Sequence, residues 1–272
     1  MPELPEVETF RADLQAVLPG RVFTGARSDW PRQLPMNSPD ELDCGVRGRR
    51  VVGVGRHCKI LILELSDGVL LFHFKMSGRL VIAPSGEETD PYAHVVLGLD
   101  NGDELRFRDP RKFGRVWLLD DPAPVLGALG PYALAPDLTE RAFADRIRHR
   151  RGRLKPLLLN QSFVAGIGNI YADEALWEAR LHPLAEAQDL SARRVAALYA
   201  AVRSVLDTGV KARGATITTG GYRDLGGAEG SMAAQLHVFR RTGESCHRCG
   251  AIVTRIVVGT RGTHFCPRCQ RI

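Results

Sequence analysis

The stretch VVGVGR at residues 51–56 opens a series of short runs that decides the fold. Further runs of the same kind lie at residues 60–65, 69–75, 79–83, 94–99, 104–108 and 115–119. Turn signals separate several of them, namely SDG at 66–68, SG at 77–78 and NG at 101–102. Seven short strands with turns between them predict a β-sandwich or barrel.

Helical patterns flank these strands. Residues 4–18 repeat apolar side chains at helical spacing, and Pro19-Gly20 ends the predicted helix. Residues 21–45 are mixed, and three prolines there indicate loops. After a Pro-rich stretch at 121–137, helical patterning covers residues 139–150, 154–161, 169–180 and 191–206. Residues 209–235 are rich in Gly and Thr, which predicts a mobile loop.

The cysteines at the end of the chain predict a metal site. Cys246-x-x-Cys249 and Cys266-x-x-Cys269 are separated by 16 residues, a spacing typical of a structural tetrahedral Zn²⁺ site. Four thiolates leave no open position on the ion, so one zinc would stabilise the fold and take no part in chemistry. The nearby His247 and His264 remain rival ligands, and two disulfides remain the other alternative.

Charge is divided unevenly along the chain. Residues 1–138 hold 16 Lys+Arg and 20 Asp+Glu, a net of −4, whereas residues 139–272 hold 21 and 11, a net of +10. A basic half is typical of a protein that binds a polyanion, although a basic solvated surface would look the same. No apolar run has the length of a membrane span and no signal peptide is evident, so we expect a cytoplasmic protein.

The beginning of the chain, PELPEVE at residues 2–8, offers a reactive amine. Removal of Met1 would leave the secondary amine of Pro2 beside the carboxyl group of Glu3. A terminal amine titrates at roughly 7.7–8.0, so it is a usable nucleophile toward a carbonyl carbon near neutral pH. The alternative is an ordinary helix start, where Pro and Glu are both favoured.

Three further motifs lie at predicted turns. GIGN at residues 166–169 joins two predicted helices and would let a phosphate approach the second helix N-terminus, although such a turn alone is weak evidence. HFKMSG at 73–78 and DPRKFG at 109–114 place Met76 and Phe113 on loops. Apolar residues on loops can act as wedges in bent DNA, and the alternative is that both pack in the core.

These motifs, in this order, resemble those of the formamidopyrimidine-DNA glycosylases over almost the whole chain. The resemblance implies an α+β multidomain fold, with an N-terminal β-sandwich and helix followed by a helix–two-turn–helix domain and a zinc ribbon. It also implies a base-excision repair glycosylase/AP lyase that removes 8-oxoguanine and formamidopyrimidines from duplex DNA. The enzyme would form a Schiff base on Pro2, cleave by β,δ-elimination, and act as a monomer on DNA of the bacterial nucleoid.

The resemblance also implies roles for individual residues. Pro2 would attack the sugar, Glu3 would protonate its ring oxygen, and Glu6 would support both. Met76, Arg111 and Phe113 would fill the void left by a flipped nucleotide. The catalytic set is Pro2, Glu3, Lys59 and Arg261, and the DNA-binding set is His73, Met76, His94, Arg111, Lys112, Phe113 and Asn169. Cys246, Cys249, Cys266 and Cys269 would hold the zinc.

The implied domains are a catalytic domain at 1–130, a linker at 131–138, a DNA-binding domain with a lesion-capping loop at 139–235 and a zinc-ribbon finger at 236–272. Some positions depart from the family pattern. Lys75 replaces a usual Gly, Lys112 replaces a usual Arg, and the loop at 214–235 lacks the expected PGYF-like segment. An endonuclease VIII-type enzyme for oxidised pyrimidines, a non-catalytic damage reader and a zinc-ribbon regulator therefore remain alternatives.

Overall fold

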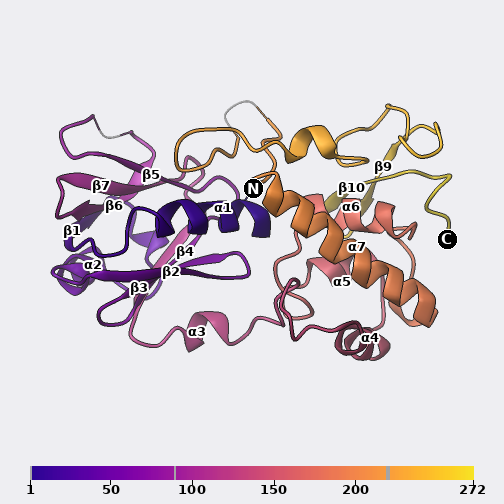
Figure 1. Ribbon diagram of the computed structural model, residues 1–272, viewed down its shortest axis with the longest axis horizontal. Helices are drawn as coiled ribbons and strands as arrows, with labels where there is room; N and C mark the ends of the chain where they lie inside the picture. Colours follow the sequence, from indigo (N-terminus) through magenta and orange to yellow (C-terminus); the bar gives the residue numbers. More distant parts are fainter. Residues whose placement is uncertain (1, 89, 219–220) are drawn as a thin grey trace. The chain divides into compact units, whose positions relative to one another are not determined.

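A computed structural model describes residues 2–88, 90–218 and 221–272 (Figure 1). The chain forms two compact units, Met1–Gly127 with Ala212–Ala233 and Ala128–Lys211 with Ala234–Ile272. The domain boundaries expected from the sequence stay a prediction. The compact units differ from them because Ala212–Ala233 belongs to the first unit, and because the expected linker at 131–138 lies within the second.

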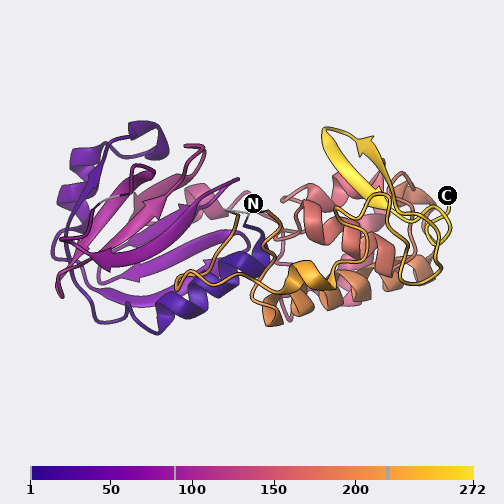
Figure 2. The same ribbon diagram turned by 90° about the horizontal axis from the view of Figure 1, so that it is seen from above.

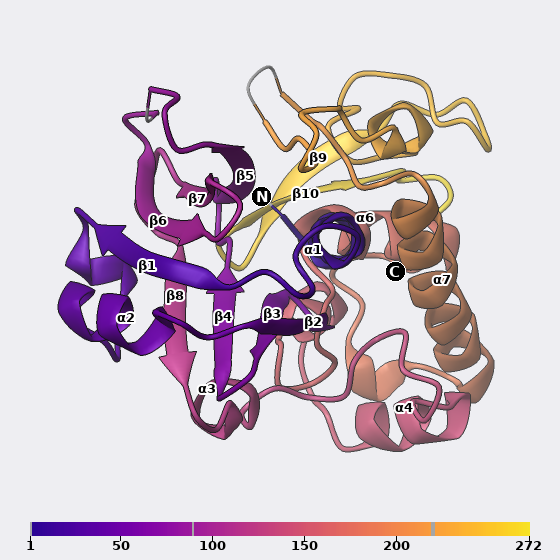
Figure 3. The same ribbon diagram turned by 60° about the vertical axis from the view of Figure 1, so that its left-hand side comes forward.

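The first unit is built on two four-stranded antiparallel sheets, as predicted for a sandwich (Figures 1 and 3). One has the order β1-β6-β7-β5 and the other β2-β3-β4-β8. The first sheet comprises Phe23–Ser28, Ala93–Leu99, Asp103–Arg108 and Arg79–Pro84 in that order. The second comprises Val51–His57, Ile60–Leu65, Val69–His73 and Arg115–Leu119.

The helix α1 (Leu4–Gln15) packs against β2 and β3. Its buried side chains Val7, Phe10 and Leu14 belong to the same apolar cluster as side chains of both sheets. Phe10 stacks on Phe74 with ring centroids 4.9 Å apart. Burial of this stripe fixes the helix, and therefore the chain end before it, to the sandwich core.

Two elements of the first unit were missed in the mixed region 21–45. The helix α2 (Pro39–Val46) begins with a capping box, in which Ser38 Oγ accepts a hydrogen bond from the Glu41 N–H and the Glu41 carboxylate accepts one from the Ser38 N–H. The Ser-x-x-Glu spacing could have predicted this start. The strand β1 was hidden by Gly25, and its place was decided by pairing with β6. A short 3₁₀ turn, η1 (Pro31–Gln33), lies between them.

The second unit contains α4 (Glu140–Arg148), α5 (Leu154–Leu159), α6 (Asn169–Glu178) and α7 (Ala192–Lys211). The antiparallel hairpin of β9 (Thr254–Val258) and β10 (Arg261–Phe265) is drawn in yellow in Figure 2. The helix α7 ends beyond its predicted limit at residue 206 because Leu206 and Gly209 remain on its buried face. The short elements are α3 (Ala123–Leu126), η2 (Ala187–Asp189) and η3 (Met232–Gln235). No helix among the described residues is long and apolar enough to span a membrane.

Candidate active site and nucleic-acid interface

The first residues of the chain are held in place by one carboxylate. Glu6 is fully buried, and its Oε2 accepts a hydrogen bond of 2.7 Å from the Glu3 N–H. Its other oxygen, Oε1, accepts a hydrogen bond of 2.7 Å from the Ala215 N–H. Glu3 is 1% exposed, and Pro2 before it is also buried. The Pro2-Glu3 end is therefore ordered against the body of the first unit.

The turn that carries Lys59 is attached to the same helix. The Arg56 Nε donates to Glu8 Oε2 at 2.8 Å, and the Arg56 Nη1 donates to the carbonyl of Cys58, also at 2.8 Å. Burial by itself would raise the pKa of Glu8, but hydrogen bonds from Arg11 and Arg56 outweigh it and hold the pKa below its usual value. An ionised Glu8 thus fixes the turn that precedes Lys59, a link that sequence reasoning missed.

His73 ends β4 as a neutral hydrogen-bond donor. Its Nδ1 accepts a hydrogen bond of 3.0 Å from the Lys75 N–H, which leaves the ring proton on Nε2. Burial, with the cations Lys75, Lys59 and Arg115, lowers the pKa of His73 to about 3. A neutral N–H donor beside several cations suits a phosphate oxygen.

A cavity of about 190 Å³ in the first unit borders the chain end. Its walls come from four places, the start of the chain, the turn between β4 and β5 with the first residue of β5, the end of β7 with the loop after it, and the segment after α7. The lining residues are Pro2, Met76, Ser77, Gly78, Arg79, Arg108, Pro110, Thr218, Gly221 and Tyr222. Two of the sequence-predicted residues, Pro2 and Met76, therefore face one cavity.

The loop at 109–114 is organised by Asp109, which sequence reasoning did not single out. Its buried carboxylate accepts hydrogen bonds from the Gly114 N–H at 2.6 Å, from the Gln33 Nε2 at 3.2 Å and from the Ser77 hydroxyl. An Asp before Pro at a turn is a recognised acceptor of such loop N–H groups, so this signal was present in the sequence. Through Ser77, Asp109 also ties this loop to the turn that carries Met76.

The tip of this loop presents the predicted wedge residues. Phe113 is 48% exposed, so it does not pack in the core, whereas Met76 is half-buried. The guanidinium carbon of Arg111 lies 4.9 Å from the centre of the Phe113 ring. The ammonium nitrogen of Lys112 lies 4.2 Å from the centre of the Trp30 ring. Both cations thus lie over aromatic faces and remain available to a ligand.

His94 occupies a different environment from the other predicted DNA-binding residues. It is 2% exposed, and its Nδ1 lies 2.8 Å from Asp29 Oδ1. Its role in DNA binding stays a prediction, and in this structure the ring is buried beside an exposed acid.

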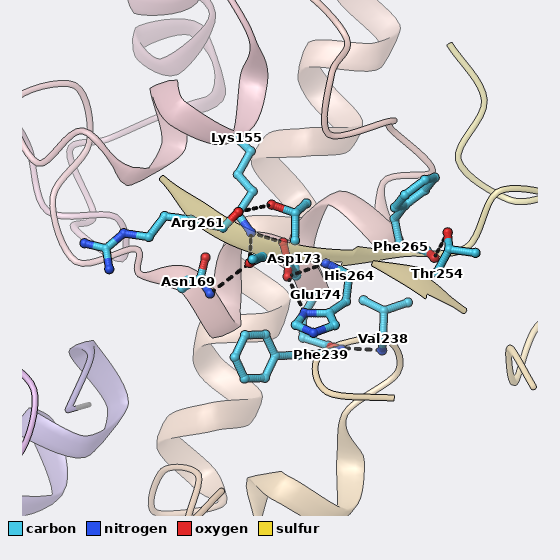
Figure 4. Close-up of polar contacts among 12 residues, drawn as sticks. Lys155, Asn169, Asp173, Glu174, Val238, Phe239, Thr254, Arg261, His264 and Phe265 are labelled. Atoms are coloured by element: carbon cyan, nitrogen blue, oxygen red, sulfur yellow. Dashed lines mark hydrogen bonds and ion pairs between the residues drawn. The ribbon is translucent and has the colours of Figure 1, made fainter. Parts of the chain in front are cut away.

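In the second unit, α5 and α6 both bind one carbonyl oxygen of β10 (Figure 4). The Gly262 carbonyl accepts hydrogen bonds from Lys155 Nζ at 2.9 Å and from Asn169 Nδ2 at 3.2 Å. Arg261, the next residue back along the hairpin, is exposed, and its side chain extends away from these contacts. Asn169 and Arg261, predicted from separate motifs, are thereby brought to the same place.

Two acids of α6 hold the ribbon, and neither was predicted. Asp173 forms a fully buried ion pair with Lys155, with 2.6 Å between Oδ1 and Nζ. Its Oδ2 lies 2.9 Å from the His264 N–H, which donates to it, and 3.1 Å from the ring Nδ1 of His264. Glu174 accepts three hydrogen bonds from the successive N–H groups of residues 237–239, at 2.8, 2.9 and 2.8 Å. Burial raises the pKa of Glu174 despite these N–H groups.

The four ribbon cysteines fit a zinc ion. Their Sγ atoms all lie within 4.8 Å of one another and form no disulfide. The Cys246–Cys269 and Cys249–Cys266 sulfur distances are 3.9 and 3.4 Å. A tetrahedral ion with Zn–S bonds of about 2.3 Å places its sulfurs roughly 3.8 Å apart. The four cysteines thus suit one structural zinc with four thiolate ligands. His264, the rival ligand, instead has its ring Nδ1 next to the carboxylate of Asp173.

Comparisons with known proteins agree with this geometry. Residues 1–116 match the formamidopyrimidine-DNA glycosylase N-terminal domain and residues 129–220 match the H2TH domain of the same glycosylases. Residues 243–272 match the zinc finger found in FPG and IleRS. The formamidopyrimidine-DNA glycosylase of Herpetosiphon aurantiacus is 45% identical, covering 99% of this chain and 100% of its own. That of Protochlamydia amoebophila is 41% identical and covers 100% of both chains.

Solved structures give the same result. A Lactococcus lactis FPG mutant in complex with DNA containing Fapy-dG superposes with a TM-score of 0.93, at 34% identity over 100% of both chains. The L. lactis Fpg in complex with DNA containing an abasic site also has a TM-score of 0.93, again at 34% identity and full coverage of both chains. The fold, the cysteine cluster and the sequence therefore agree, and this chain belongs to the formamidopyrimidine-DNA glycosylase family.

Proposed function

We propose that this chain is a base-excision repair enzyme that removes oxidised purines from duplex DNA and then cleaves the strand at the abasic site. The observation that carries the proposal is the buried Pro2-Glu3 end, held by Glu6 at the edge of a cavity. The named relatives support the substrate class, because the L. lactis structures hold DNA with Fapy-dG or with an abasic site. The substrate would be DNA of the bacterial nucleoid in the cytoplasm, and the enzyme would act as a monomer.

The chemistry begins at the chain end once Met1 has been removed. The unprotonated nitrogen of Pro2 attacks C1′ of the deoxyribose, and the bond from C1′ to the damaged base breaks as the base leaves with a proton. Glu3 protonates the ring oxygen, and the sugar opens to an iminium ion on Pro2. The iminium acidifies the C2′–H bond, so loss of that proton expels the 3′ phosphate by β-elimination. A second elimination expels the 5′ phosphate, and water then releases the amine.

The remaining predicted residues would hold the DNA. In the first unit, Lys59 and His73 would bind phosphates, with the neutral ring of His73 donating through Nε2. The exposed Phe113, with Met76 and Arg111, would occupy the space left by the extruded nucleotide. Lys112 would add a backbone contact, and His94, which is buried near the start of the inner strand β6, would contribute only indirectly.

In the second unit, Asn169 and Arg261 would bind phosphates beside the shared Gly262 carbonyl. The zinc would hold the ribbon that carries Arg261 and would supply no reacting group. Its absence would therefore weaken DNA binding without altering the order of bond breaking.

Borohydride trapping on an abasic-site duplex tests the proposal. Reduction of the iminium should leave a stable protein–DNA adduct, and mass spectrometry of the digested adduct should place it on Pro2. A chain with an uncleaved N-terminal extension has an amide at Pro2 and should form no adduct, while Pro2→Gly should trap less. Pro19→Gly, at an exposed proline after α1, is the matched control and should trap like the native chain.

The same assay separates the alternatives. A native chain that binds the duplex but forms no adduct would be a non-catalytic damage reader. Faster excision of thymine glycol than of 8-oxoguanine opposite cytosine would indicate an endonuclease VIII-type enzyme. An adduct on any residue other than Pro2 would contradict the proposed nucleophile.

A further inference from the structure

The cavity beside Pro2 is lined by a cation that has no hydrogen-bond partner among the described residues. Of its described lining residues, only Arg79 and Arg108 are charged. They are direct partners in the register of β5 and β7, so their side chains emerge at the same point of the sheet. Like charges at such a pair are unfavourable unless each finds an acid or a ligand.

The two arginines differ in the hydrogen-bond and ion-pair partners of their guanidinium groups. The Nε of Arg108 donates to the carboxylate of Asp90, and its guanidinium carbon lies 4.9 Å from the centre of the Tyr92 ring. Arg79 has no hydrogen bond or ion pair with any described residue, and its Nε is buried without an acceptor. Asp90, whose charge acts on Arg79, is already bonded to Arg108. Burial and the charge of Arg108 lower the pKa of Arg79, yet a guanidinium stays protonated.

A buried donor without an acceptor is costly, and such groups in folded proteins usually have a partner or a function. The rest of the wall around Arg79 combines apolar surface from Met76 and Pro110 with the polar side chains of Ser77 and Thr218. Apolar surface with a few convergent polar groups is typical of a pocket for a small ligand. A planar guanidinium fork matches neighbouring carbonyl oxygens of such a ligand.

We propose that Arg79 is a specificity-determining residue that donates hydrogen bonds to an acceptor oxygen of the extruded base. The inference rests on the proposed function, in which Pro2 attacks C1′. Because the damaged base is bonded to C1′, a base next to Pro2 enters the cavity that Arg79 lines. Oxidised purines are planar bases that carry carbonyl oxygens, which can accept such hydrogen bonds. A backbone phosphate offers the same acceptor chemistry, and the experiment below distinguishes the two sources.

The test compares two substrates that differ only in the base. Arg79→Met is assayed in single turnover on a duplex with 8-oxoguanine opposite cytosine and on the same duplex with a preformed abasic site. Loss of a hydrogen bond from a charged group should slow base release by about 10-fold to 100-fold. Cleavage of the abasic duplex should stay within about 2-fold of the native rate, because that substrate has no base. Arg79→Lys, which keeps the charge but not the fork, should be intermediate on the base-containing duplex.

Two controls keep the result interpretable. Arg21→Met removes a half-buried arginine of the same unit that forms an ion pair with Asp100 at 3.8 Å, and it should change neither rate. Thermal unfolding of Arg79→Met should show no loss of stability, because the native side chain has no hydrogen bond or ion pair with a described residue to lose. An equal loss on both duplexes would instead assign Arg79 to a phosphate. Unchanged base release would overturn the proposal, whereas failure of native protein to cleave either duplex would overturn the proposed function itself.

Discussion

Glu6 of α1 and Glu174 of α6 have similar tasks in the two units, because each binds backbone N–H groups of a segment that is distant in sequence. They differ in how firmly that segment is held. Each is a buried carboxylate on a helix. Among the described residues, Glu6 accepts such a bond from Ala215, besides one from the Glu3 N–H. Glu174 accepts three from residues 237–239.

The surroundings widen this difference. Beside Glu174 lies the fully buried Lys155–Asp173 pair, which also engages the ribbon through Gly262 and His264. The segment that Glu6 holds is also secured by the buried Tyr222, whose ring packs edge-on against Phe10, and by Arg213, which bonds to Asp13 and Asp224 and is 48% exposed. Exposed ion pairs are weakened by solvent. We therefore expect the ribbon to be released less readily than the segment around Ala215. This difference would suit a ribbon that binds phosphate in a fixed position and a segment around Ala215 that can move when a base enters the cavity.

The largest effect should follow loss of the zinc. Cys266→Ser removes one thiolate, and because structural zinc contributes about 10 kcal/mol or more to folding of such modules, the ribbon should unfold. DNA affinity should fall sharply while the sandwich remains folded. Metal analysis, circular dichroism and a binding titration measure this, with the exposed Cys44→Ser as the control. A variant that lacks metal but keeps its DNA affinity would contradict the importance of the ribbon.

Breaking the buried pair should have the next largest effect. Lys155→Met leaves the Asp173 carboxylate buried without its cation, which typically costs about 3–5 kcal/mol. Chemical denaturation should show this loss, together with weaker DNA binding as Gly262 loses its Lys155 hydrogen bond. Arg153→Met, at an exposed cation two residues away, should be close to native. If both variants unfolded alike, the ribbon would not depend on this pair.

A smaller and more local effect should come from Gly214→Ala. The new Cβ would lie 2.7 Å from the Glu6 Cγ, and φ at this residue is +83°. The left-handed backbone costs about 1–2 kcal/mol for a residue other than glycine, and displacement of Glu6 should slow both base release and abasic-site cleavage. Gly227→Ala is the matched control, because its φ is +87° but its Cβ would contact nothing within 4 Å. Equal kinetic losses in the two variants would mean that the contact with Glu6 is unimportant.

The smallest effect should be a pH dependence from His73 in the first unit. Its pKa is about 3 in the folded chain and roughly 6.5 when unfolded, so between these values the unfolded state binds the extra proton. The contribution of neutral His73 is therefore complete above about pH 6.5 and decreases as the pH falls toward 3. Unfolding free energies at pH 7 and pH 5 should differ more for the native chain than for His73→Asn. An equal pH response would show that another group is responsible.

Features that depend on neighbouring residues could be predicted from the sequence. The strands from 51 to 119, the four main helices and the cysteine cluster all follow from local periodicity or spacing. The sequence left the exposure of Phe113 open, because a loop residue can also pack in the core, and the structure shows its side chain exposed. The strand β1 was missed because its place depends on pairing with β6, which lies about 70 residues away. Glu174 and the Arg56–Glu8 pair were missed for the same reason, because the partners of a polar side chain are chosen by the fold.

The sequence by itself determined that a processable Pro2-Glu3 end, a glycine turn and two cysteine pairs are present, because each is a property of adjacent residues. Only the tertiary structure decided what these residues meet. It connects Glu6 with Ala215, 209 residues later, and brings Asn169 to Gly262, 93 residues later. It also pairs Asp90 with Arg108, and it leaves Arg79, which lines the same cavity as Pro2, without an ion pair to any described residue. Strand register and helix packing bring such distant groups together, and local spacing carries no information about that choice.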